Sequence, residues 1–149
     1  MAIPPEQLQV LLKAYETCQS LAKSNGESSW AVRSWGLGIW SALIAYSFKE
    51  RVPGIAVVAL VVLICVFIVE MAIRQIQYAF IRRALVIEDS LNDILVGGCV
   101  RLPASGVSTN IETPTLSDLI ELLRIKRWLL WLPYVLLVSF TVIAINVYP

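Results

Sequence analysis

Three long apolar stretches constrain this chain of 149 residues more than any other feature. They cover residues 30–48, 53–73 and 128–148, and crossing the hydrocarbon core of a bilayer takes about 20 such residues. The second is the clearest, because no charged residue occurs from Gly54 to Val69. A buried helix in a water-soluble protein can imitate one such stretch, but not three in so short a chain. The sequence therefore predicts an all-α integral membrane protein with three transmembrane helices.

The positive charges predict the orientation of these spans. We count ten lysines and arginines in the N-terminal region, including Arg33 at the start of the first span, and between the second and third spans, but only Lys49 and Arg51 between the first and second. Cytoplasmic segments carry the excess of positive charge in membrane proteins. We therefore expect a multi-pass protein of a cell inner membrane, with the N-terminus in the cytoplasm and the C-terminus outside.

The polar parts of the chain predict a cytoplasmic region built from helices. Residues 4–24 have apolar positions at intervals of three and four, which indicates a helix, and residues 23–29 (KSNGESS) are expected to interrupt it before the first span. The second span is expected to continue as a cytoplasmic stalk to residue 96, and its packing stripe follows the same rhythm: Ile73, Ile76, Phe80, Ala84, Ile87, Leu91 and Ile94. Residues 97–114 read as a loop, and residues 115–127 as an amphipathic helix that leads into the third span.

Catalytic and metal-binding motifs are absent from the sequence. There is no histidine, and the three cysteines are too far apart for a C-x-x-C motif. The nearly balanced charge, twelve basic against eleven acidic residues, argues against nucleic acid as a partner. We therefore predict no catalytic residue, no metal site and no cofactor.

Two groups of residues remain as candidates for function. Small residues at Ser34, Gly38, Ser41 and Ala45 lie at helical spacing on the first span, where they suit close helix packing or the lining of a pore. Near the cytoplasmic end of the second span, four charged residues form a candidate ion pair or lipid-headgroup contact: Glu70, Arg74, Arg82 and Arg83. We also expect Pro133 to kink the third span.

The layout of residues 1–96 resembles that of small bacterial membrane proteins of the SLATT type, which are two-span effectors. The resemblance rests on Arg33, Trp35, Glu70, Arg74 and Arg83, and the third span departs from it. It implies a pore-forming or membrane-perturbing effector, used in bacterial conflict and phage defence.

The sequence leaves three functions open. The first is a non-enzymatic homo-oligomer that forms a pore or perturbs the membrane. The second is a small lipid-modifying enzyme that uses Glu70 with Arg74, Arg82 or Arg83. The third is an accessory subunit that docks on a larger protein partner in the cytoplasm through residues 4–24 and 97–125.

Overall fold

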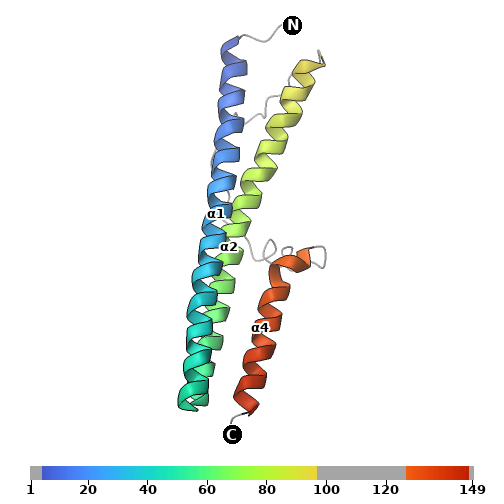
Figure 1. Ribbon diagram of the computed structural model, residues 1–149. Coiled ribbons are helices and arrows are strands. Elements are labelled where there is room, and N and C mark those ends of the chain that lie inside the picture. The colour runs from blue at the N-terminus through green and yellow to red at the C-terminus, as the bar shows by residue number, and fades with distance from the viewer. Residues whose placement is uncertain (1–4, 97–126, 148–149) are drawn as a thin grey trace.

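The computed structural model describes residues 5–96 and 127–147, and every regular element in these ranges is a helix. Helix α1 spans Pro5–Glu50, α2 spans Pro53–Leu95 and α4 spans Trp128–Val147. At about 1.5 Å per residue, α1 and α2 are about 69 Å and 65 Å long. Figure 1 shows α1 and α2 as a long antiparallel pair, with the shorter α4 beside one half of α2.

The turn between α1 and α2 takes only two residues outside the helices. Arg51 adopts the left-handed conformation with φ 56°, and Val52 is extended, as a residue before proline prefers. Pro53 then begins α2, where its missing N–H leaves no hydrogen bond unmade. The hydroxyl of Ser47 donates to the carbonyl of Val52 at 3.0 Å and fastens the turn. So short a turn fixes the register of the two helices.

The interruption that we expected over residues 23–29 is wrong, because α1 runs through them without a break. The Asn25 amide and the Ser28 hydroxyl donate to carbonyls four residues back, at 2.8 and 3.0 Å, so they do not compete with the helix. Gly26 lies so close to Gln77 that a Cβ at this position would be 2.8 Å from the Gln77 side-chain nitrogen. Contact with α2 therefore outweighs the low helix propensity of this segment.

The two-helix end of the molecule, residues 5–25 and 79–96, has an apolar core of its own. Leu11, Cys18 and Ala22 of α1 are buried against side chains of the stripe on α2, of which Phe80, Ala84 and Ile87 are buried and Ile76, Leu91 and Ile94 partly buried. Ile73 is half-buried outside this cluster. The Tyr15 hydroxyl donates to the Glu88 carboxylate at 3.3 Å, and desolvation, together with that charge, raises the pKa of Tyr15 above 10.

The three-helix end, residues 26–78 with α4, is more apolar. α2 and Trp128–Asn146 of α4 are long and apolar enough to cross a membrane, and most of their apolar side chains face outward. Ile44, Ala56 and Ala59 form a small cluster on which Ile145 of α4 packs. The segments predicted over residues 97–114 and 115–126 lie outside the described residues.

Pro133 lies inside α4, as the sequence analysis expected for the third span. Because proline has no N–H, the carbonyl of Leu129 lacks its usual donor four residues ahead. The first turn of α4 leans away from the axis of the remaining helix in Figure 1. The neighbouring carbonyl, that of Leu130, accepts a hydrogen bond from Arg33 of α1 at 3.2 Å.

Candidate functional site: a buried ion-pair cluster

Glu70 of α2 is the centre of a buried polar cluster in the three-helix end. Its side chain is 1% exposed, although the helix around it is apolar. Arg33 of α1 pairs with it through both ends of the guanidinium. Nη2 is 2.8 Å from Oε1, and Nε donates to Oε2 at 2.9 Å. A bidentate pair of this kind is among the strongest polar contacts in proteins, because each charge is partly neutralised by two aligned hydrogen bonds.

Three further groups approach the same carboxylate. The Ser29 hydroxyl of α1 donates to Oε1 at 3.2 Å, and the Tyr134 hydroxyl of α4 donates to Oε2. Arg74, one turn along α2, has its Nε 3.6 Å from Oε1. Side chains from all three described helices therefore meet at Glu70, and the carboxylate joins them at one level of the bundle.

Arg33 itself connects α1 to α4 in two more ways. Its Nη2 donates to the Leu130 carbonyl at 3.2 Å, within the turn that Pro133 loosens. Its guanidinium carbon also lies 5.6 Å from the centre of the Tyr134 ring and 5.3 Å from that of Trp30. Aromatic faces attract a cation at these distances. Arg33 is therefore held by one carboxylate, one carbonyl and two rings.

A second polar contact lies nearer the α1–α2 turn. The Trp40 indole N–H donates to the Thr141 hydroxyl at 3.0 Å, and the Trp40 and Phe140 rings meet edge to face at 6.0 Å. Thr141 is fully buried. α4 is thus fixed to the long helix pair at two levels, by Tyr134 and by Thr141, with the apolar contact of Ile145 beyond them.

The chemistry of the cluster favours a structural role for Glu70. Both of its oxygens accept hydrogen bonds from cationic or hydroxyl donors, so no lone pair faces open space as a general base requires. Two arginines stand against one carboxylate, which leaves the cluster with an excess of one positive charge. Among residues 5–96 and 127–147, no group of three potential metal-ligating side chains comes together.

The four charged residues that the sequence predicted as one group do not all lie together in the structure. Glu70 and Arg74 lie together, and the nearer partner of Glu70 is Arg33 rather than Arg74. Arg82 is exposed about 18 Å farther along α2 from Glu70, outside the cluster, and Arg83 lies one residue beyond it. Sequence reasoning missed Ser29 and Tyr134 as partners of the carboxylate.

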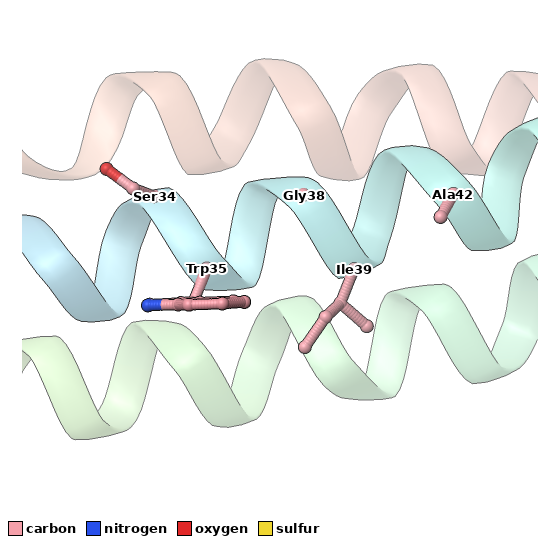
Figure 2. A pocket seen from close by; sticks show the side chains of 5 residues that line it. All are labelled: Ser34, Trp35, Gly38, Ile39 and Ala42. Atoms are coloured by element: carbon pink, nitrogen blue, oxygen red, sulfur yellow. The ribbon is translucent and has the colours of Figure 1, made fainter.

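The predicted small residues lie on the outer face of α1, away from the other two helices. Ser34, Gly38, Ser41 and Ala45 are all exposed. The hydroxyls of Ser34 and Ser41 donate to carbonyls of their own helix, at 2.9 and 2.6 Å. A shallow open groove with a volume of about 360 Å³ lies on this face, lined by Ser34, Trp35, Gly38, Ile39 and Ala42. Figure 2 shows the positions of these residues along α1.

Comparisons with known proteins give no family for this chain. No protein-family model matches it, and neither the curated proteins nor the solved structures yield a match.

Proposed function

We propose that this chain is a non-enzymatic membrane protein that crosses the bilayer three times and self-associates to form a pore or to perturb the membrane. Support for the third span comes from packing. Residues 30–48 of α1 lie against the apolar half of α2 in a fixed antiparallel register. If α2 crosses the membrane, this part of α1 crosses beside it.

The proposed orientation follows from the distribution of charge. The two-helix end carries Lys13 and Lys23 on α1 and Arg82 and Arg83 on α2, whereas the residues at and beside the α1–α2 turn carry only Lys49 and Arg51. The positive-inside rule places the two-helix end in the cytoplasm and the α1–α2 turn outside. We propose a bacterial inner membrane as the location and phage defence as the setting, by the resemblance to SLATT-type effectors.

Self-association is proposed from one observation, the contrast between two glycines of α1. Gly36 is buried, and a Cβ there would overlap the methyl groups of Val66, so its small size serves the packing of α1 on α2. Gly38 is exposed, and a Cβ there would meet nothing. A glycine inside a helix costs about 1 kcal/mol relative to alanine. Among residues 5–96 and 127–147 of one chain no contact offsets that cost at Gly38. A helix of a second copy in the adjacent groove would offset it, since small residues let membrane helices approach closely.

The occupied carboxylate supports the non-enzymatic alternative over a lipid-modifying enzyme. A catalytic Glu70 would need a free oxygen facing the substrate, yet it accepts from Arg33, Ser29 and Tyr134. A cytoplasmic partner protein for residues 4–24 stays a prediction.

The experiment compares Gly38→Ile with Gly36→Ile in the full chain. We expect Gly38→Ile to leave the fold of the single chain intact and to abolish both cross-linked oligomers and dye leakage from liposomes. Gly36→Ile overpacks the α1–α2 contact and should destabilise the chain by about 1–3 kcal/mol. Size-exclusion chromatography in mild detergent, chemical cross-linking and leakage are measured on the same preparations.

A second pair of variants controls for the added side chain. Ser41 and Ser139 are both exposed serines whose hydroxyls donate to a carbonyl four residues back. Ser41→Leu lies on the proposed contact face of α1 and should weaken the oligomer, whereas Ser139→Leu on α4 should not. A wild-type chain that stays monomeric in membranes, or oligomers that persist in Gly38→Ile, would refute the proposal.

A further inference from the structure

Cationic and aromatic side chains form a second feature beside the Glu70 cluster. Glu70, Arg74 and Tyr78 follow one another at intervals of four residues, so each lies about one turn beyond the one before it on neighbouring faces of α2. Arg127, directly before α4, lies over the Tyr78 ring with its guanidinium carbon 4.4 Å from the ring centre. Tyr78 is one helical turn beyond Arg74 on α2, so Arg127 contacts α2 next to Arg74 although the two arginines are far apart in the sequence.

The positive charge at this place is only partly compensated. Glu70 is bound by Arg33 more closely than by Arg74, whose Nε lies 3.6 Å from the carboxylate and makes no hydrogen bond. Arg74 Nη1 donates to the Gln77 side-chain oxygen at 3.2 Å. Among the described residues, no carboxylate lies within ion-pair distance of Arg127. Because Arg74 Nε is buried against Glu70, the donors that remain for an anionic group are the Nη atoms of Arg74 and the guanidinium of Arg127.

Two independent lengths place these arginines at one level of a bilayer. Arg74 lies about 32 Å along α2 from Pro53, just beyond a hydrocarbon core of about 30 Å. Arg127 precedes α4, which is itself about 30 Å long. The exposed Trp128 and Trp30 lie near the same level, where aromatic side chains prefer the interface. This is the depth of the phosphate groups of the lipids.

We propose that Arg74 and Arg127 bind the phosphate of an anionic phospholipid headgroup in the cytoplasmic leaflet. Tyr78 positions Arg127 by holding the guanidinium over its ring. The inference rests on the proposed transmembrane arrangement and not on self-association. The donors are suited to the ligand, since a guanidinium can present two parallel N–H groups to a phosphate.

The test uses the purified full chain in detergent with equal amounts of phosphatidylglycerol and phosphatidylcholine, and counts retained lipids by native mass spectrometry. We expect the wild-type chain to retain one phosphatidylglycerol in preference to phosphatidylcholine. Arg127→Gln should lower that preference about fivefold and Arg74→Gln/Arg127→Gln about 25-fold, by the contribution typical of one arginine at an anionic surface. Arg127→Gln is informative by itself because it leaves every contact of Glu70 in place.

The control Lys49→Gln/Arg51→Gln removes the same charge from the opposite end of the bundle and should keep the wild-type preference. Tyr78→Phe keeps the aromatic ring and should leave the lipid preference unchanged. Tyr78→Leu removes the ring and should lower that preference by about two- to fivefold.

Equal lipid retention by wild type and the double variant would overturn the proposal, as would equal losses in the two double variants, which would indicate diffuse attraction. If an excess of inorganic phosphate displaced the lipid as well as added phosphatidylglycerol does, the site would be one for free phosphate, and the lipid assignment would fail. Cross-linking of the same samples shows separately whether self-association holds.

Discussion

The two ends of this molecule are held together by different kinds of contact. In the two-helix end, apolar side chains such as Leu11, Cys18 and Phe80 are enclosed between helices whose exposed residues are mostly polar. In the three-helix end the arrangement is reversed. Apolar side chains cover the outside, and the ion pair of Arg33 and Glu70 lies within.

This contrast is the one expected if, as proposed, the two-helix end lies in water and the three-helix end in lipid. In water, burial of apolar surface drives helices together. In lipid that force is absent, and close packing with hydrogen bonds between helices takes its place. The polar cluster at Glu70 and the Trp40–Thr141 contact are the interactions that an end surrounded by lipid requires.

The most direct test of the difference between the two ends is Glu70→Gln, which neutralises the carboxylate at the centre of the buried cluster. We expect a loss of about 3–5 kcal/mol in the free energy of unfolding, because Arg33 would be left buried without a counter-charge. The measurement is a denaturant titration in mixed micelles, followed by helical circular dichroism.

Two further variants serve as controls for this measurement. Glu88→Gln removes an exposed carboxylate from the two-helix end and should cost less than about 1 kcal/mol. The double variant Arg33→Met/Glu70→Leu removes both charges and should recover most of the stability lost in Glu70→Gln. A Glu70→Gln chain as stable as Glu88→Gln would show that the ion pair does not hold the helices together.

Replacing one buried leucine by alanine in each end tests the same contrast, with effects of intermediate size expected. Leu11 and Leu63 are buried to almost the same extent, 2% and 1% exposed. Leu11→Ala should cost about 2–3 kcal/mol, since it loses apolar burial from water as well as packing. Leu63→Ala loses only packing if lipid replaces water, and should cost about half as much. Hydrogen exchange of each segment gives the two values, and a larger cost at Leu63 would contradict the assignment of the solvents.

The smallest effect is expected for the hydrogen bond between Trp40 and Thr141. Thr141→Val keeps the shape and removes the acceptor, and should cost about 0.6 kcal/mol, which is typical between membrane helices. Ser139→Ala, whose hydroxyl bonds only within α4, is the matched control. Trp40 emission reports separation of α4, and identical denaturation midpoints for the two variants would argue against this contact as a tether.

The long second helix was predictable from sequence, but the unbroken first helix was not. From Pro53 to Leu95 an apolar rhythm continues without glycine or proline after the first two residues, and the helix follows it. In α1 the local signal at KSNGESS favours a loop. It is overridden by contacts that the local sequence does not contain, such as that of Gly26 with Gln77.

Of the cluster, Glu70 and Arg74 were predictable because they belong to one helix. A usable signal for Arg33 was present, since it lies 17 residues before Glu50 and Glu70 lies 17 after Pro53, so an antiparallel hairpin brings them level. In an antiparallel hairpin, residues at the same level have residue numbers with a constant sum. That sum is 103 for Arg33 and Glu70, and it is also 103 for Tyr15–Glu88 and Gly26–Gln77. No comparable rule locates Tyr134, because the segment between α2 and α4 is too long to fix the position of α4 along the helix pair.

The absence of a hinge in α1 has a mechanical consequence. A helix of 46 residues with no proline after its first position behaves as a stiff rod, and its partner α2 is almost as long. A rotation or tilt of the helix ends near Leu11 is therefore not taken up by a bend within α1. It is transmitted to the level of Arg33, about 33 Å away. If the three-helix end lies in the membrane, as proposed, the helix pair would carry a movement of its aqueous end to the Arg33–Glu70 pair.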